Sequence, residues 1–263
     1  MQTIKTPAVA GLFYPADPAL LHQDIQHFLT SAHRATTSHP KALIAPHAGY
    51  VYSGPIAGSA YASLDATSRD KINRVIILAP AHRVAFRGIA YSSATHFQTP
   101  LGLIPVNLSA LSLITDLPMV TKNNEAFQDE HSIEVHLPFL QEILDEFSIV
   151  PLLVGEASAE QVATVLEQLW GGSETLVVIS SDLSHYLDYE SARKMDQDTS
   201  QAIETLQPGA LTYHSACGRT PISGLLLCAK RYGLNVNTLD LRNSGDTAGS
   251  HDRVVGYGAY AFS

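Results

Sequence analysis

The sequence predicts a single α/β domain with a mostly parallel central sheet and helices on both faces. Short apolar runs of strand length alternate along the chain with segments of helical periodicity. Near-continuous Val/Ile/Leu strands separated by helices are typical of a parallel sheet that is covered on both faces. No linker, repeat or change of composition divides residues 1–263, so we expect one domain rather than two.

The strands are predicted from apolar runs rich in β-branched residues, such as "VIILA" and "LVVIS", because these side chains favour the extended conformation. The predicted strands are residues 42–45, 75–79, 149–154, 176–180, 236–241 and 253–262, with 88–92 as a further candidate. Pro46 follows the first strand and Pro80 follows the second. Proline fixes its own φ and ends the ladder, so each of these strands is expected to end in a stiff turn.

The helices are predicted from apolar stripes of helical period and from start and stop residues. Asp17 reads as an N-cap with Pro18 at the first helical position, and Thr220 with Pro221 repeats this signature. Gly233 is a stop signal for the last of these helices. The predicted helices are residues 17–32, 55–64, 107–114, 132–146, 158–170, 190–206 and 220–232.

Composition and charge exclude several classes of protein. Hydrophobic residues make up 45% of the chain and charged residues 16%, which argues against disorder. The net charge of −9 disfavours nucleic-acid and membrane-surface partners, which attract clustered Lys and Arg. No apolar run approaches the ~20 residues of a membrane-spanning helix. The start of the chain lacks the apolar core of a signal peptide. With only two cysteines, Cys217 and Cys228, a disulfide scaffold is excluded and a cytoplasmic location is expected.

Histidines follow three of the predicted strands. His47 comes after "ALIAP", His82 comes after "VIILAPA", and both Asp182 and His185 come after "LVVIS". In open α/β sheets, ligands bind beyond the carboxyl ends of the strands. One such histidine is more often structural than functional, but three at equivalent strand ends favour a metal site or an acid–base site.

A fourth histidine precedes a predicted helix. The segment "DEHSIEVHLPFLQEIL" places His131 at the helix start, where backbone N–H groups and the helix dipole create a polar site. A structural and a functional role are both open for His131. Its spacing from His136 is not that of the His-x-x-x-His zinc-protease motif, so we reject that interpretation.

Cys217 also precedes a predicted helix, in the segment "ACGRTPISG". A helix N-terminus and the neighbouring Arg219 would both favour the thiolate, which is the form that binds metals or attacks electrophiles. Cys228 lies within the apolar face "GLLLCAK" and is expected to pack in the core.

With these residues together, the chain resembles the Memo family over nearly its whole length. The resemblance is carried by "AVAGLFYP" (8–15), "IAPHAGYVYSG" (44–54), "EHSIEVHLPFL" (130–140), "SSDLSHY" (180–186) and "CGRTPI" (217–222). The family commonly has a Gly-Pro-Ser-His type of turn after the second strand. Here the turn is Ala79-Pro80-Ala81-His82, which keeps the histidine.

This resemblance implies a fold similar to that of class III extradiol ring-cleaving dioxygenases. Those enzymes hold Fe(II) with two His and one Glu and use a further His as acid and base. By motif, His47 and His82 would be the imidazole ligands, and Cys217 would stand in place of the carboxylate. His185 would be the acid–base residue, with Asp182 beside it.

The candidate catalytic set is completed by His131. The resemblance implies a bound iron or copper ion, and a sulfur ligand favours Cu(I), zinc or ferrous iron over hard cations. We therefore expect iron(II) or copper, with zinc as the alternative.

Animal relatives are regarded as mediators that bind phosphotyrosine-containing receptor segments, and microbial relatives often occur near a radical-SAM protein. A peptide and a radical-SAM protein are thus implied as partners.

The residues alone are compatible with four functions. The first is a metal-dependent, dioxygenase-like oxidoreductase that acts on a small aromatic or phenolic molecule in the strand-end cleft. The second is a non-catalytic binding or adaptor protein that takes a peptide or partner protein in the same cleft. The third is a metal-dependent hydrolase, which the lack of a carboxylate-rich cluster disfavours. The fourth is a metal-free enzyme with Cys217 as nucleophile.

Overall fold

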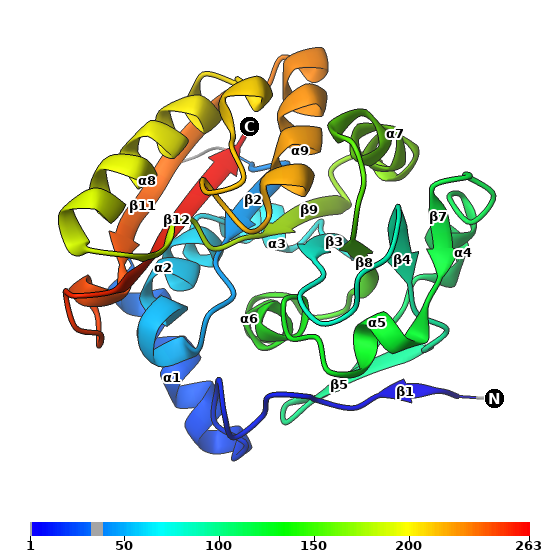
Figure 1. The fold of residues 1–263 in the computed structure, drawn as a ribbon. Coiled ribbons are helices and arrows are strands. Elements are labelled where there is room, and N and C mark those ends of the chain that lie inside the picture. Colours follow the sequence, from blue (N-terminus) through cyan, green and yellow to red (C-terminus); the bar gives the residue numbers. More distant parts are fainter. Residues whose placement is uncertain (1, 33–38) are drawn as a thin grey trace.

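The computed structural model describes residues 2–32 and 39–263, in which one large mixed sheet carries helices on both faces (Figure 1). The strand order is β10-β12-β2-β9-β3-β8-β4-β7, and β11 pairs with β12. The strands of this sheet are β2 (Ala42–Ala45), β3 (Arg74–Pro80), β4 (Ile89–Tyr91), β7 (Val120–Lys122), β8 (Ser148–Val154), β9 (Thr175–Ser180), β10 (His185–Leu187), β11 (Val236–Asn243) and β12 (Val254–Phe262). Every strand expected from the sequence is present, with bounds close to those predicted.

The parallel part of the sheet lies at its centre. β2 pairs with β9, β9 with β3, and β3 with β8, all in parallel. On either side of this centre, β12 is antiparallel to β2 and β4 is antiparallel to β8. Because β11 and β12 follow each other through a short connection, they also pair antiparallel. The α/β prediction is therefore confirmed, with the parallel strands at the centre of a sheet that is mixed as a whole.

The central strands form the core of the molecule. Every residue of β2 and β9 is buried, and so is every residue of β3 and β8 after the first. Burial on both faces explains why these strands are unbroken apolar runs rather than alternating ones. Since all of them point the same way, their carboxyl ends meet at one edge of the sheet, and the residues that follow gather there.

Helices cover both faces of this sheet, as Figure 1 shows. α1, α2 and α6 pack together on one face, whereas α7 and α9 pack on each other and α8 lies along β11 and β12. The helices are α1 (Pro18–Ser31), α2 (Tyr50–Ala62), α3 (Ala66–Arg69), α4 (Leu108–Ser112), α5 (Asn124–Gln128), α6 (Leu137–Ile143), α7 (Ala159–Leu169), α8 (Tyr189–Glu204) and α9 (Arg219–Tyr232), with 3-10 turns η1 (Glu134–His136), η2 (Pro208–Ala210) and η3 (Ser244–Asp246). None of the described helices is long and apolar enough to cross a membrane.

The helix signals in the sequence are only partly followed. Asp17 caps α1 as expected, because its side chain accepts from the N–H groups of residues 19 and 20. Gly233 ends α9 in the left-handed conformation, at φ +69°. However, α9 starts one residue earlier than predicted, so Thr220 lies in the first turn and Gly218 is the N-cap. Helix α2 also starts earlier, at Tyr50, and contains Pro55 rather than beginning there.

A second, smaller sheet lies near the N-terminus and was not indicated by the sequence. Its strands are β1 (Ile4–Lys5), β5 (His96–Thr99) and β6 (Gly102–Pro105). These strands are short and only partly buried, so they lack the apolar run on which strand prediction depends.

Candidate metal centre

His47 lies at the first strand end, two residues after β2, and is 2% exposed. Its Nδ1 lies 2.6 Å from Ser180 Oγ, and that hydroxyl donates its own proton to Ser132 O at 2.6 Å. Ser180 must therefore accept from His47, which places the ring proton on Nδ1 and leaves the Nε2 lone pair free. Burial is the main cause that lowers the pKa of His47. The ring is neutral, which is the form that binds metals.

His82 lies at the second strand end and is held by a buried carboxylate. Glu130, which is 4% exposed, accepts from the His82 backbone N–H and, at 3.1 Å, from its Nδ1. Burial alone would raise the pKa of Glu130, but hydrogen bonds from His82 and Ser132 outweigh it and lower that pKa to about 2. The ionised carboxylate keeps a proton on His82 Nδ1, so Nε2 is the nitrogen available to a metal.

Cys217 reaches the same place from the loop before α9. Its Sγ lies 3.4 Å from His47 Nε2 and accepts from the backbone N–H of Asp182 at 3.3 Å. The Cys217 N–H in turn donates to Asp182 O at 3.2 Å. Gly218 approaches the end of β9 so closely that a Cβ there would lie 2.6 Å from Ser181 Cβ. These contacts hold the loop against the end of β9, and they thereby fix the position of the Cys217 sulfur.

In the chain without a bound cation, burial opposes the thiolate that the helix start and Arg219 were expected to favour. Burial, followed by the Asp182 carboxylate, raises the pKa of Cys217 to about 12. The loss of hydration outweighs the hydrogen bonds from the Asp182 and Gly218 backbone and from the Ser181 side chain, which lower this pKa. A bound cation would displace the thiol proton. The site therefore suits a metal ligand better than a free cysteine nucleophile.

The three predicted metal ligands converge in space. His47, His82 and Cys217 each offer a ligand atom, and these atoms lie within 4.8 Å of one another. A tetrahedral ion with ordinary bond lengths needs its donor atoms about 3.5 Å apart, so only a small inward movement separates this arrangement from a coordination sphere. Two neutral imidazoles and one sulfur suit Cu(I), zinc or ferrous iron. Metal binding itself stays a prediction.

His131 lies against both ligand histidines. Its ring stacks on His82 with centroids 5.3 Å apart and planes at 17°, and its centroid is 5.6 Å from that of His47. Burial is the main cause that lowers the pKa of His131 to about 4. His131 thus adds a third neutral imidazole beside the cluster. It precedes the 3-10 turn η1 rather than opening an α-helix as expected.

A second group, His82 with Glu130 and His131, is also close enough to share an ion. The Glu130 oxygens, however, already accept from the backbone N–H groups of His82, His131 and Ser132. A carboxylate used in this way orients its neighbours and has little capacity left for a metal. We therefore treat Glu130 as the support of His82 rather than as a ligand.

Asp182 and His185 follow β9, the third strand end. The Asp182 carboxylate accepts from the His47 backbone N–H at 2.8 Å, and burial raises the pKa of Asp182. His185 is exposed, and its Nδ1 bonds to Leu183 O at 2.8 Å, which leaves Nε2 free to accept a proton. The charge of His185 affects the pKa of both His47 and Asp182. His185 is therefore within electrostatic range of the cluster, and its acid–base role stays a prediction.

Sequence reasoning missed the residues that orient the ligands. Ser180 is the polar last residue of an otherwise apolar strand, and Glu130 directly precedes His131 in a motif already singled out. Ser180 could have been found because a polar side chain at the end of a buried strand needs a hydrogen-bond partner. For Glu130 and Ser132 the pairing depends on contacts between segments about 50 positions apart, which no local pattern shows.

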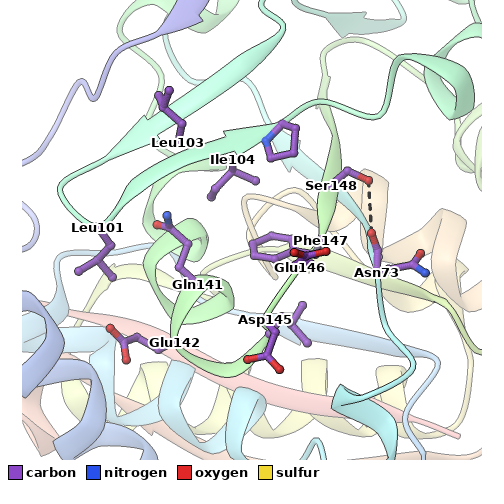
Figure 2. Close-up of a pocket in the computed structure, with 12 residues that line it drawn as sticks. Asn73, Leu101, Leu103, Ile104, Gln141, Glu142, Asp145, Glu146, Phe147 and Ser148 are labelled. Carbon is purple, nitrogen blue, oxygen red and sulfur yellow. Dashed lines mark hydrogen bonds between the residues drawn. The ribbon is translucent and has the colours of Figure 1, made fainter.

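One sizeable cavity lies away from these residues. It has a volume of about 720 Å³ and is lined by Leu101, Leu103, Phe147 and three acidic residues, Glu142, Asp145 and Glu146, among others (Figure 2). Its wall includes Asn73 and Ser148, which stand at the amino ends of β3 and β8. The histidine and cysteine cluster is at the carboxyl ends, roughly 20 Å away along strands of this length.

Comparisons with known proteins agree with this arrangement. The family model described as Memo-like protein matches residues 5–261. A MEMO1 family protein from Aquifex aeolicus is 33% identical over 265 residues, covering 97% of this chain and 97% of the relative. MEMO1 family proteins from Saccharolobus solfataricus and Thermotoga maritima are 34% and 33% identical, over 98% and 96% of this chain and 99% and 97% of their own lengths. On this near-complete match, the chain belongs to the Memo family.

Proposed function

We propose that this protein is a metal-dependent oxidoreductase that binds iron(II) or copper and acts on a small aromatic substrate. The proposal is carried by the convergence of His47, His82 and Cys217 at the carboxyl edge of the sheet. Three protein ligands leave positions open, which is the catalytic rather than the structural pattern. When bound, such an ion would supply Lewis-acid and one-electron redox chemistry.

The surrounding residues supply the remaining functions that such a reaction needs. His185 has a free Nε2 on the exposed side, where a phenol could transfer its proton to it. Asp182 holds the His47 backbone, so it positions a ligand. The His47 and His131 rings lie against each other, with centroids 5.6 Å apart, and cover one side of the cluster. The similarity of the family fold to class III extradiol dioxygenases supports an aromatic substrate.

Metal titration tests the ligand set directly. Fe(II), Cu(I) and Zn(II) are titrated anaerobically into the wild type, Cys217→Ser and Cys228→Ser. We expect one ion per chain, and a large loss of affinity for the first variant only, because Cys228 is buried in α9 and its Sγ approaches Ala163 O rather than the cluster. Equal affinities in the two variants would exclude Cys217 as a ligand.

Oxygen consumption then tests the reaction. The iron-loaded and copper-loaded proteins are supplied with a panel of catechols, phenols and aminophenols. We expect oxygen uptake above that of the His47→Ala variant under the same conditions. A metal-loaded protein that consumes no oxygen with any member of the panel would contradict the oxidoreductase proposal.

The second candidate function is a binding protein, and one surface favours it. Leu12 is 81% exposed and Val51 is 63% exposed. Their segments are held together by the Tyr50 N–H, which donates to Phe13 O at 2.8 Å. Contiguous exposed apolar patches mark partner surfaces, and this candidate function requires that Leu12 and Val51 belong to one. A peptide or the radical-SAM protein would be the partner, and a Leu12→Ser/Val51→Ser variant that loses its binding without changing metal affinity would support this function.

A further inference from the structure

A second cavity adjoins the candidate metal centre on the sulfur side. It has a volume of about 550 Å³ and lies between the carboxyl ends of β3 and β8 and the start of α9. Its wall includes Cys217 and the Pro80-Ala81 turn that precedes His82. A molecule in this cavity would therefore touch one candidate ligand and the turn that carries another. Cavities of about 300–1,000 Å³ are the usual size for small-molecule sites.

The walls of this cavity suit an apolar, aromatic body. Its lining includes Val84, Phe86, Val154, Tyr213 and Pro221. Flat rings bury well between aromatic and aliphatic side chains and gain from edge or offset contacts.

Arg219 places a positive charge at this cavity, and none of the ion pairs among the described residues includes it. Two arginines line the cavity, and Arg87 pairs with Glu156 at 3.4 Å. The Arg219 guanidinium lies 5.4 Å from the centre of the Tyr213 ring. Within residues 2–32 and 39–263, Arg219 makes no ion pair with a carboxylate. A half-buried guanidinium of this kind is suited to bind a carboxylate through two parallel hydrogen bonds.

The first turn of α9 adds to this positive end of the cavity. Thr220 is among the residues that line the cavity, and the helix has no side-chain cap at Gly218. The Arg219 N–H already donates to Ala216 O at 3.2 Å and Pro221 has no N–H, so the helix dipole rather than a set of free N–H groups favours an anion here. The charge of Arg219 and the helix end thus act on the same part of the cavity.

We propose that this cavity is the substrate pocket and that the substrate is a small aromatic carboxylate. Its carboxylate pairs with Arg219, and its ring lies between Phe86 and Tyr213 and reaches the Cys217 side of the cluster. The inference rests on the proposed function for the presence of chemistry at the cluster, but the binding mode that it states needs neither metal nor turnover.

Calorimetric titration of the metal-free, full-length protein tests this pocket. The probes are 3,4-dihydroxybenzoate, its methyl ester and phenyl phosphate. We expect the acid to bind roughly tenfold or more tightly than the neutral ester, because a charge-assisted bidentate pair is lost in the ester. An ester that binds as tightly as the acid would overturn the proposal, and tighter binding of phenyl phosphate than of the acid would overturn the assignment to a carboxylate.

Three variants locate the charge that is responsible. Arg219→Gln should abolish the preference for the acid, and Arg219→Lys should keep part of it, because the charge remains while the fork geometry is lost. Arg87→Gln is the matched control, since its charge lines the same cavity but is already paired, and it should keep the preference. A preference that survives Arg219→Gln in a folded protein contradicts the inference.

The two proposals fail in different ways. Binding of the acid through Arg219 without oxygen consumption by the metal-loaded protein contradicts only the oxidoreductase function. Oxygen consumption with equal affinity for acid and ester contradicts only the carboxylate pocket.

Discussion

At the scale of single residues, two hydrogen-bond acceptors decide which nitrogen each ligand histidine presents. Ser180 takes the Nδ1 proton of His47 because its own hydroxyl proton is committed to Ser132 O. Glu130 takes the Nδ1 proton of His82. In both rings Nε2 is then the free donor atom. Partners of this kind typically change metal affinity by roughly 10- to 100-fold, so these residues are expected to matter although they touch no metal.

The first prediction concerns Ser180→Ala. Loss of the acceptor frees the His47 ring to change tautomer or rotate, so Zn(II) affinity should fall by roughly 10-fold or more. A competition titration against a coloured chelator measures it. Ser184→Ala is the control, because Ser184 is buried in the loop that follows Ser180 and its hydroxyl lies beside Asp196 rather than His47. If both variants bind zinc like the wild type, Ser180 does not orient His47.

The second prediction concerns Glu130→Gln. The neutral amide no longer holds a proton on His82 Nδ1 by charge, so metal affinity should fall by roughly 10- to 100-fold. Glu134→Gln is the matched control. Glu134 is equally buried, at 4%, but it accepts from the N–H groups of Ala8 and Val9 and from the Tyr14 hydroxyl. It should lower the unfolding free energy without changing the affinity of the remaining folded protein, and the reverse pattern would contradict the assignment.

At the scale of elements, the site depends on how closely the start of α9 approaches the end of β9. The Gly218 N–H donates to Ser181 Oγ at 2.9 Å, and the Ser181 N–H donates to Ala45 O at 2.9 Å. A chain of hydrogen bonds through Ser181 thus links the start of α9 to the ends of β9 and β2. The loop before α9 carries the Cys217 sulfur, the first residue of α9 carries the Arg219 charge, and the helix itself packs on α7.

The third prediction follows from this close approach. In Gly218→Ala the new Cβ would meet Ser181 Cβ at 2.6 Å and Ser180 O at 2.7 Å, so the loop must move. We expect a loss of about 1–3 kcal/mol in unfolding free energy and weaker metal binding, because Cys217 moves with the loop. Chemical denaturation and metal titration measure the two effects. Gly209→Ala should change neither, since nothing lies within 4 Å of a Cβ at that position.

At the scale of the whole molecule, the two ends of the parallel strands differ in chemistry. The carboxyl end holds the histidine and cysteine cluster and the cavity with Arg219. The amino end holds the larger acidic cavity of Figure 2. The net charge is −9, so an unpaired guanidinium beside the cluster would create a local positive region in an acidic protein. Such a region concentrates anionic ligands at the candidate site.

The fourth prediction concerns the stability of the whole molecule against pH. Asp196 is 3% exposed, and burial raises its pKa to about 6 from the ordinary value of 3.8. A raised pKa means that the folded state binds the proton more tightly. The contribution of this tighter proton binding to the unfolding free energy is therefore fully present below pH 3.8, and it is lost as the pH rises through about 6.

Asp196→Asn should accordingly be more stable than the wild type at pH 8, by about 1–3 kcal/mol, and the difference should vanish near pH 4. Denaturant unfolding of the metal-free protein at a series of pH values measures it. Asp198→Asn, an exposed carboxylate on the same helix, is the control. A variant that is less stable than the wild type at pH 8 would show that the ionised carboxylate of Asp196 stabilises the fold.

Local patterns were sufficient for the α/β class, the central strands and the residues that follow them. The runs "ALIA" and "LVVIS" are apolar because both faces of the sheet are covered. Because the carboxyl ends of parallel strands meet at one edge of the sheet, the sequence alone predicted that His47, His82 and Asp182 lie at that edge. Cap residues such as Asp17 act through contacts within one turn of helix, so the sequence alone also predicted them.

Tertiary structure alone decided the antiparallel flanks, the small second sheet and the protonation of the site. The pKa of Cys217 is set by burial and by Asp182, and the ring orientation of His82 is set by Glu130, 48 positions away in the chain. The unpaired state of Arg219 likewise depends on which carboxylates fold beside it. Hydration and long-range electrostatics are properties of the assembled structure, whereas strand and helix patterns are properties of neighbouring residues.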